Sequence, residues 1–332
     1  MIFLIITLAM GLLMPFQTAA NSRLRGVVGP AYVSTLVSFS VSTLALLLVS
    51  LLAGIPILPT HEMLDAAPWW SWFVGIVAVV TITIAIHLFK EIGQLQALII
   101  PMFSQLIFSL MIDHFGWFGA KVIPLGTNRI IGAMMLILGV TLVVILPRLK
   151  AQKSANNTST GSRQAFWQFM AVLSGCLSAS ITGAYAQLSA IVGNPVQATT
   201  VAFFVATIAL LLFCTCLGKT RLVGKAFSRE MTEQREPSNG FEGPSRDGIR
   251  RSQYPWWMWT GGLCGAIIVF GNAWLVPQVG VGVFSMALLV GQLALSMLME
   301  HHGWLGAPRK AISWPQIIGI LLMLAGVALI RL

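Results

Sequence analysis

Long apolar runs separated by short polar stretches dominate the chain. Ten of these runs have about 20 mostly apolar residues, which is the length that an α-helix needs to cross the hydrocarbon core of a bilayer. They cover residues 1–20, 31–54, 70–88, 94–112, 128–147, 165–186, 197–217, 257–276, 281–299 and 315–331. The pattern predicts an all-α integral membrane protein with ten transmembrane helices.

The first run resembles a secretory signal peptide because it ends in Thr18-Ala19-Ala20-Asn21. However, no basic residue precedes its apolar stretch, and a signal peptide normally starts with one. A related segment also recurs later in the chain. We therefore expect a first helix that is retained in the mature protein.

Composition supports the same fold class. The chain has 332 residues, of which 57% are hydrophobic and 9% are Asp, Glu, Lys or Arg. A soluble domain carries roughly 25% charged residues, so these charges are too few to cover the surface of a water-soluble globule. The composition excludes a soluble enzyme, a nucleic-acid-binding domain and a secreted disulfide scaffold as the main interpretation.

The distribution of basic residues predicts the orientation. The formal net charge is +10, and 17 of the 20 Lys and Arg residues fall on one side of the predicted membrane. These are Arg23, Arg25, Lys90, Arg148, Lys150, Lys153, Arg163, Lys219, Arg221, Lys225, Arg229, Arg235, Arg246, Arg250, Arg251, Arg309 and Lys310. The other three are Lys121, Arg129 and Arg331. Because cytoplasmic loops are enriched in Lys and Arg, we expect a multi-pass protein of the inner (plasma) membrane with both termini on the external, periplasmic side.

The chain contains the same pattern twice. Residues 68–72 read Pro-Trp-Trp-Ser-Trp and residues 255–259 read Pro-Trp-Trp-Met-Trp, a shift of 187 positions that continues without a gap to the end of the chain. The N-terminal parts of the two copies match at a shift of 164 positions, as Gly11 does with Gly175. The sequence therefore predicts two copies of a five-helix unit.

An odd number of crossings makes the second copy start on the opposite side of the membrane. The two repeats, at 1–150 and 164–332 with a cytoplasmic linker at 151–163, are therefore predicted to be inverted. Residues 218–254 are rich in Glu, Arg, Ser, Gly and Pro, which predicts a flexible cytoplasmic loop within the second repeat. Inverted repeats are frequent in transporters, with the substrate site between the repeats near the middle of the membrane. Channels can have the same architecture.

Two motifs resemble a known family. They are Gly11…Pro15-Phe16-Gln17-Thr18-Ala19-Ala20-Asn21-Ser22-Arg23-Leu24-Arg25 and Gly291-Gln292…Ser296…Glu300-His301…Gly303-Trp304…Gly306. Both resemble YdcZ-like membrane proteins of the drug/metabolite transporter superfamily, in the form that fuses two five-helix units. The resemblance implies ten helices around a central cavity and export of a small molecule by alternating access, and it does not identify the substrate.

The two repeats depart from each other within these motifs. The first has the polar set Gln17, Asn21 and Arg23, and the second has Ile181, Tyr185 and Gln187 at the matching positions. Ser104 stands in the first repeat where the second has a glycine. We therefore expect an asymmetric cavity.

Polar side chains inside the predicted spans are the candidate substrate-binding residues, because a polar group in hydrocarbon is costly unless it is paired or faces a cavity. Gln105 and Ser109 are on one face of a predicted helix, and Gln292 and Ser296 repeat this stripe. The candidate cavity comprises Gln17, Asn21, Gln105, Ser109, Tyr185, Asn272, Trp274, Gln292 and Ser296. Hydrogen bonding between helices is the alternative role for these side chains.

The helix ends carry the remaining candidates. Asp113 and Glu300 continue the two polar stripes to the ends of their helices, where we expect capping or interface bonding. His87 and Glu91 close the third predicted helix at its cytoplasmic end, and histidine titrates near neutral pH, so both are candidates for proton coupling. An interfacial cluster that includes Lys90 is the alternative.

The sequence favours a transporter over an enzyme. It has no Walker pattern for ATP, and no Ser/His/Asp, His-x-x-x-His or paired-carboxylate set at a workable spacing. We expect a secondary transporter, in particular an exporter of a small molecule, with no cofactor, no metal and no nucleic-acid partner. Because both repeats are in one chain, a monomer can form the whole unit within the lipid bilayer.

Two alternatives to this interpretation stay open. A channel or facilitator can be built on the same scaffold. A membrane component without transport activity can instead dock a soluble partner through residues 218–254.

Overall fold

The computed structural model describes the chain except residues 1, 146–160, 218–255, 307–308, 310 and 332. The predicted flexible loop at 218–254 and residues 151–160 of the predicted linker therefore lie outside the described residues. The described residues form helices and no strands, in agreement with the all-α prediction.

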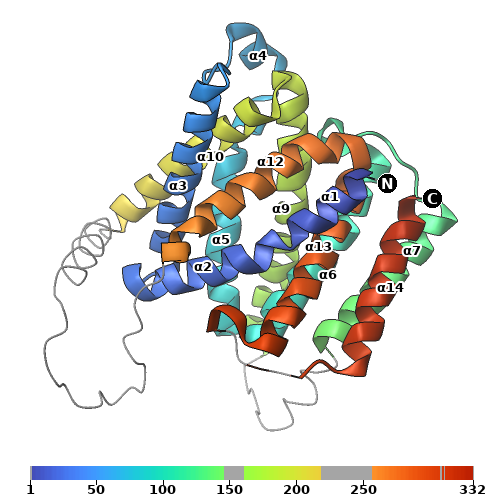
Figure 1. The fold of residues 1–332 in the computed structure, drawn as a ribbon. Helices are drawn as coiled ribbons and strands as arrows, with labels where there is room; N and C mark the ends of the chain where they lie inside the picture. Colours follow the sequence, from blue (N-terminus) through green and yellow to red (C-terminus); the bar gives the residue numbers. More distant parts are fainter. Residues whose placement is uncertain (1, 146–160, 218–255, 307–308, 310, 332) are drawn as a thin grey trace, which may run out of the picture.

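Figure 1 shows the helices coloured along the chain, from blue at the N-terminus to red at the C-terminus. The first half contains α1 (Ile2–Gly11), α2 (Leu13–Val28), α3 (Ala31–Leu52), α4 (His61–Ala66), α5 (Val74–Glu91), α6 (Gly93–Phe115) and α7 (Thr127–Val140). The second half contains α9 (Gly161–Val192), α10 (Pro195–Cys216), α12 (Gly261–Val279), α13 (Val281–His302) and α14 (Trp314–Arg331). Short helical turns are η1 (Trp69–Phe73), η2 (Trp117–Gly119), η3 (Thr141–Ile145), η4 (Trp256–Thr260) and η5 (Trp304–Gly306).

Eight helical segments of the described chain are long and apolar enough to cross a membrane. They are Ile2–Val28, Ala31–Leu52, Gln96–Phe115, Thr127–Val144, Arg163–Val192, Pro195–Cys216, Trp256–Val279 and Val281–His302. Two further apolar helical segments, Trp69–Ala85 and Trp314–Ile330, are shorter. They correspond to the third and tenth predicted spans. The protein is therefore an all-helical, multi-pass membrane protein.

The first predicted span, 1–20, is wrong in its C-terminal limit. α2 continues to Val28, so Arg23 and Arg25 lie on a helix and not in a loop. Backbone hydrogen bonds propagate through polar residues until a residue breaks the helix, and the break here is Gly29, which has a φ of 87°. The length of the apolar run therefore underestimates the length of the helix.

The sixth predicted span, 165–186, is also longer than expected. α9 starts at Gly161, inside the predicted linker 151–163, and continues to Val192. Gly193, with a φ of 75°, then ends the helix. Asn194 starts the next one, because its Oδ1 accepts a hydrogen bond from Val196 N at 2.9 Å, as an N-cap residue does.

A bend separates α1 from α2. Leu12 lies between the two helices, and its N–H donates to Ala9 O at 3.1 Å. Three residues later, Pro15 has no N–H to donate to the carbonyl of Gly11. The carbonyl of Gly11 therefore lacks the helical hydrogen bond that residue 15 would otherwise supply, within the first apolar segment.

Small residues allow close contacts between the helices of the two halves. A Cβ at Gly11 of α1 would lie 2.9 Å from the Cα of Gly291 on α13. A Cβ at Gly175 of α9 would lie 2.7 Å from the Cβ of Ser104 on α6. Membrane helices without a hydrophobic driving force associate through such close packing.

α7 and α14 form a pair at one edge of the molecule (Figure 1). A Cβ at Gly132 would lie 2.6 Å from Gly326 O, and one at Gly139 would lie 2.7 Å from Gly319 O. Since Gly132 precedes Gly139 while its partner Gly326 follows Gly319, the two helices are antiparallel.

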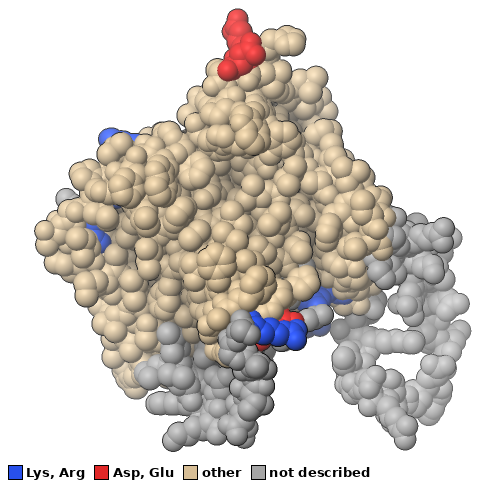
Figure 2. All heavy atoms as spheres, turned by 180° about the vertical axis from the view of Figure 1, so that it is seen from behind, with Lys and Arg blue, Asp and Glu red and all other residues tan. Residues whose placement is uncertain are grey.

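Charged side chains are rare on the centre of the face that Figure 2 shows. Acidic side chains gather at the tip formed by α4, which carries Glu62 and Asp65. Basic and acidic side chains also gather at the opposite end. The uncharged centre between them is suited to contact with lipid.

Candidate functional site

A polar seam runs between α2, α3 and α12. Ser38 Oγ donates to Asn21 Oδ1 at 2.6 Å, and Ser42 Oγ donates to a backbone carbonyl of α12 at 2.7 Å. Gln17 extends its amide to the same interface, where a Cβ at Gly265 would lie 2.8 Å from Gln17 Nε2. Two predicted site residues, Gln17 and Asn21, are thus brought together at one interface, where Asn21 has an interhelical hydrogen bond.

The two glutamines of the predicted stripes lie beside the closest helix contacts. The backbone N of Gln105 is 2.9 Å from the Cβ position at Gly175, and that of Gln292 is 3.1 Å from the Cβ position at Gly11. Both side chains are half-buried, and neither forms a hydrogen bond with another described residue. Their amides are therefore free to bind a ligand.

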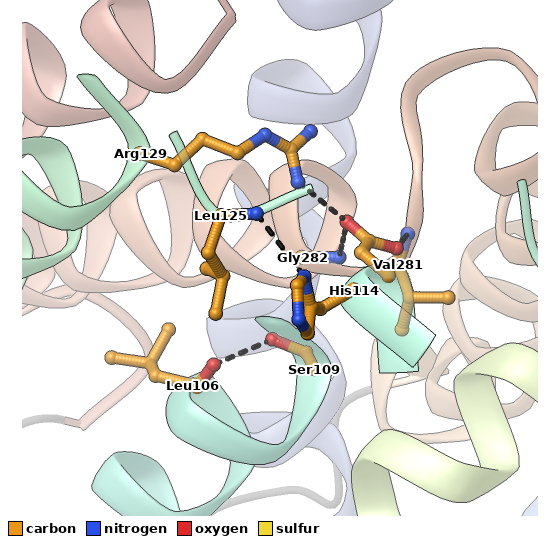
Figure 3. Close-up of polar contacts among 8 residues, drawn as sticks. Leu106, Ser109, His114, Leu125, Arg129, Val281 and Gly282 are labelled. Atoms are coloured by element: carbon orange, nitrogen blue, oxygen red, sulfur yellow. Dashed lines mark hydrogen bonds and ion pairs between the residues drawn. The ribbon is translucent and has the colours of Figure 1, made fainter. Parts of the chain in front are cut away.

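The two serines of these stripes differ from each other. Ser109 is fully buried, and its Oγ donates to Leu106 O of its own helix at 2.8 Å (Figure 3). Ser296 is half-buried and has no hydrogen bond within the described part of the chain. A hydroxyl that bonds its own helix is satisfied without a substrate, so Ser296 is the better candidate of the two.

Tyr185 lies in apolar surroundings. It packs with Val74, Ala184 and Ala202 in a cluster contributed by α5, α9 and α10. In the first copy, the matching position is Asn21, which belongs to the polar seam. The two halves therefore differ in polarity here, as the sequence predicts.

Four buried polar atoms have no hydrogen-bond partner among the described residues. They are Trp72 Nε1, Gln187 Oε1, Asn272 Oδ1 and Ser285 Oγ. Asn272 is 8% exposed and Ser285 is 4% exposed. An unsatisfied polar group in the membrane interior costs several kcal/mol, so these atoms are candidates for hydrogen bonds to a ligand.

The sequence identified only one of these four side chains, Asn272, as a binding candidate. A serine within an apolar run, such as Ser285, most often bonds a carbonyl of its own helix, so its sequence context gives no signal. Trp72 belongs to a tryptophan cluster at the start of a predicted span, a pattern typical of interfacial anchors. Burial and the lack of a partner can be recognised only in the folded structure.

Asp113 and Arg129 form a buried ion pair that joins α6, α7 and α13 (Figure 3). Arg129 Nη1 lies 3.4 Å from Asp113 Oδ2, and Asp113 is fully buried. The carboxylate also accepts hydrogen bonds from Val281 N at 2.7 Å and Gly282 N at 3.0 Å. It therefore caps the N-terminus of α13, which confirms the predicted capping or interface role of Asp113.

The connection between α6 and α7 is fixed at the same place. Ile123 N donates to the backbone O of Asp113 at 2.7 Å. Figure 3 shows the second bond, in which Leu125 N donates to His114 Nδ1 at 3.2 Å. The end of α6, the start of α13 and this connection therefore form one hydrogen-bonded unit.

The two candidates for proton coupling lie at the end of α5. Glu91 forms two hydrogen bonds with Arg163 at the start of α9, at 2.8 and 2.9 Å. His87 is exposed, stacks on Trp167 at 5.9 Å and has its Nδ1 2.9 Å from Thr83 O. The structure thus places both on the α5–α9 contact, apart from the polar seam.

Trp274 and Asn272 point in different directions, since they are two positions apart on one helix. Trp274 is 39% exposed and packs edge-on against Phe3 at 6.2 Å, whereas Asn272 is buried. Asn272 and Trp274 therefore do not face the same side of α12.

An apolar groove of about 400 Å³ lies between α6 and α9. Its lining residues are Ile100, Phe103, Ser104, Ile107, Phe108, Met111, Val172 and Cys176. None of the predicted site residues contributes to it. This groove suits an apolar occupant and differs in character from the polar seam.

Comparison with known proteins identifies the family. A family model described as "Putative inner membrane exporter, YdcZ" matches residues 2–142 and also residues 166–329. No curated protein matches the chain. A solved structure titled "Crystal structure of protein" aligns over 99% of this chain and 95% of its own, with a TM-score of 0.64 and 13% identity, which concerns the fold alone. Because the two matched regions cover most of the chain, this protein belongs to the YdcZ family of inner-membrane exporters.

Proposed function

We propose that this exporter is a secondary transporter that moves a small molecule out of the cytoplasm by alternating access. In this proposal, ten helices cross the membrane as two inverted five-helix halves, and both termini are periplasmic. The family match carries the export activity. The mechanism is supported by contacts that recur in the two halves at the same sequence shifts.

The first recurrence involves α1 and α9. Gly11 packs against Leu288 and Gly291 of α13. Gly11 in the first repeat corresponds to Gly175 in the second, 164 positions later. The two α13 residues correspond to Pro101 and Ser104 in the first repeat, 187 positions earlier. These are the residues of α6 against which Gly175 packs.

The second recurrence involves α5 and α12. A Cβ at Gly75 would lie 2.7 Å from Ala202 O of α10. Its counterpart Gly262 packs in the same way against Ser38 O of α3, which is the counterpart of Ala202. Two copies of one packing unit, related by inversion, account for both recurrences.

Several contacts join helix ends that lie on the same side of the membrane in the proposed topology. Glu91 and Arg163, which pair at 2.8 Å, both belong to predicted cytoplasmic ends. Gln197 Nε2 donates to Leu58 O at 3.1 Å, and both residues belong to predicted external ends. The contact of Asp113 with the start of α13 also joins two predicted external ends.

In the proposed cycle, the substrate binds between the halves at half-buried or buried amides that have no protein partner. Asn272 on α12 is the first of these, and Gln105 and Gln292 are the next. An amide offers both a donor and an acceptor, so these side chains suit a substrate with hydroxyl, amide or amine groups. Their free hydrogen-bonding capacity is what supports the assignment.

A comparison of metabolites in cells with and without the protein tests the proposal. Export requires at least one metabolite to accumulate in the medium when the protein is present, and inside the cell when it is absent. Cells with the Asn272→Leu variant, matched for protein level, are compared with both and should release roughly tenfold less of that metabolite than cells with the unmodified protein. Identical profiles in all cells would rule out export under these conditions.

An uncoupler separates the carrier from the channel or facilitator. Concentrative export by a proton-coupled carrier stops when the proton gradient collapses. A facilitator continues to move its substrate down the concentration gradient at an unchanged rate.

A further inference from the structure

Two equivalent turns contain a strained residue. Phe118, in the turn after α6, has a φ of 59°, and Leu305, in the turn after α13, has a φ of 53°. The two residues are 187 positions apart, which is the shift between the repeats. A positive φ is unfavourable for bulky residues and persists only where the surroundings hold it. Both turns therefore fix the direction of an apolar side chain.

Phe118 lies between two apolar clusters. It packs on the cluster that contains Tyr185 and on the larger cluster formed by buried residues of α6, α12 and α13, among others. Its ring meets Trp70 edge-on, with ring centroids 5.3 Å apart and an interplanar angle of 77°. Gly183 of α9 makes room for it, since a Cβ there would lie 3.1 Å from Cδ2 and 3.3 Å from Cβ of Phe118.

The base of this turn is rigid. Ile123 N is bonded to the carbonyl of Asp113, and the Asp113 carboxylate is bonded to Arg129 and to the start of α13. Phe118 is therefore held at the tip of an anchored connection at the predicted external end. Its ring packs between Trp70 of η1 and Gly183 of α9 at that end.

The equivalent turn at the other end is packed differently. Both turns contact the equivalent end of a long helix: Arg23 Nη2 lies 3.4 Å from Leu305 O, and its counterpart Gln187 has its Nε2 3.5 Å from the Cβ position at Gly119. However, Leu305 joins none of the clusters of buried apolar side chains formed by the described residues. Phe118 is inserted between helices, whereas Leu305 is half-buried and lies outside these clusters of the described chain.

We propose that Phe118 and Leu305 are the two gate residues of the transport cycle, and that the structure has the Phe118 gate closed. The proposal rests on alternating access between inverted halves. When the two halves exchange conformations, Phe118 leaves Gly183. Leu305 then packs on Ala19, which is the counterpart of Gly183. Because the contacts that each gate makes exist in one conformation only, at most one gate is closed in each state.

Engineered disulfides test the closed external gate. Phe118→Cys and Gly183→Cys are combined in a chain whose native cysteines, Cys176, Cys214, Cys216 and Cys264, are replaced by Ala. The Cβ separation of 3.3 Å is close to that of a disulfide, so an oxidant should join the pair. Phe115→Cys with Gly183→Cys is the matched control, because Phe115 is 56% exposed and should not be joined.

Oxidation of the Phe118/Gly183 pair should stop the export that the same variant shows when it is kept reduced, and a reducing agent should restore the rate of the reduced variant. The pair Ala19→Cys with Leu305→Cys should form a disulfide only in chains whose external pair is still reduced. If the external pair never forms, if it forms without affecting export, or if the Ala19/Leu305 pair never forms, the two-gate proposal is wrong.

A second measurement needs no substrate. Gln187→Cys, beneath the external turn, is labelled from outside with a membrane-impermeant maleimide in the same cysteine-free background. Phe118→Ala should raise its labelling rate by at least about tenfold, because removing a half-buried aromatic side chain that packs on two apolar clusters destabilises the closed state. Phe115→Ala is the control and should leave the rate unchanged. If the labelling rate of Gln187→Cys is unchanged in Phe118→Ala, the gate proposal is wrong.

Failure of the gate and failure of transport have different signatures. If the unmodified protein and the oxidised Phe118/Gly183 variant both export the metabolite, the gate proposal is wrong and the proposed function stands. Absence of any metabolite difference for the unmodified protein contradicts the proposed function itself, and the two-gate proposal with it.

Discussion

Thr43 Oγ1 of α3 lies 2.9 Å from Thr207 Oγ1 of α10, and these two residues are equivalent positions of the two repeats, 164 residues apart. Equivalent residues can touch only where the axis that relates the repeats passes between them. In the proposed arrangement, α3 and α10 therefore cross at this axis. An exchange of conformations between the halves leaves a contact on the axis in place.

This position predicts a crosslink that does not depend on conformation. Thr43→Cys with Thr207→Cys, in a chain without native cysteines, should form a disulfide because each sulfur takes the place of a hydroxyl oxygen. Export should continue after oxidation, in contrast to the Phe118/Gly183 pair. Gel mobility reports the crosslink, and metabolite release reports transport. Export that stops on oxidation would show that α3 and α10 separate during the cycle.

The Asp113–Arg129 pair predicts an asymmetric response to mutation. Asp113→Ala removes the cap of α13 and leaves Arg129 buried without its partner, so the free energy of unfolding should fall by roughly 3–5 kcal/mol. Arg129→Gln leaves the carboxylate with Val281 N and Gly282 N, so the loss should be smaller, about 1–3 kcal/mol. Thermal unfolding in detergent, followed by tryptophan fluorescence, measures both.

The exchanged variant, Asp113→Arg with Arg129→Asp, separates the two roles of Asp113. If the ion pair alone matters, the exchange restores stability. We expect no restoration, because a guanidinium cannot accept hydrogen bonds from the backbone N–H groups at the start of α13.

More of the fold than of the site could be predicted from the sequence. Apolar runs and the repeat identify the order of helices, since membrane-spanning segments need a minimum apolar length. Helix ends were missed at Val28 and Gly161, because glycine and hydrogen bonding determine them rather than hydropathy. Gln17 and Asn21 were both expected among the candidate cavity residues, but their partners on α3 and α12 come from distant parts of the sequence.

The gate and the unpartnered atoms lay beyond sequence reasoning for a different reason. The motif Gly-Trp-x-Gly is visible twice in the chain, at Gly116–Gly119 and Gly303–Gly306. Its third position, however, has a positive φ only because the turn folds back on its helix, and Phe118 meets Gly183 only after α6 and α9 have packed. Such properties depend on tertiary contacts and not on local composition.

The close contact of α1 with α13 predicts a position that tolerates no side chain. Gly291→Ala would place a Cβ 2.9 Å from the Cα of Gly11 and closer still to the carbonyl of Leu8, so the two backbones must separate. We expect a loss of about 1–3 kcal/mol in the free energy of unfolding. Gly26→Ala on α2 is the matched control, since nothing lies within 4 Å of its Cβ position. The free energy of unfolding of the control should rise by up to about 1 kcal/mol, because alanine has a higher helix propensity than glycine. If the control is destabilised as well, the close contact at Gly291 is not the cause of the loss.

The unpartnered amide of Asn272 predicts opposite effects on stability and on export. Asn272→Leu removes a buried polar atom that has no partner in the described chain, so the unfolding temperature should stay the same or rise. Export should fall roughly tenfold, as expected for the loss of one hydrogen bond worth about 1.4 kcal/mol to the substrate.

Asn21→Leu is the matched comparison, because the side chain of Asn21 already accepts a hydrogen bond from Ser38 at 2.6 Å. Its removal should lower stability by about 0.6 kcal/mol, the average for a hydrogen bond between membrane helices, and should affect export less than Asn272→Leu does. Protein level, unfolding temperature and metabolite release are measured for both variants at equal expression. If Asn272→Leu is less stable but exports normally, then Asn272 contributes to packing and the substrate binds elsewhere, with Gln105 and Gln292 as the next side chains to replace.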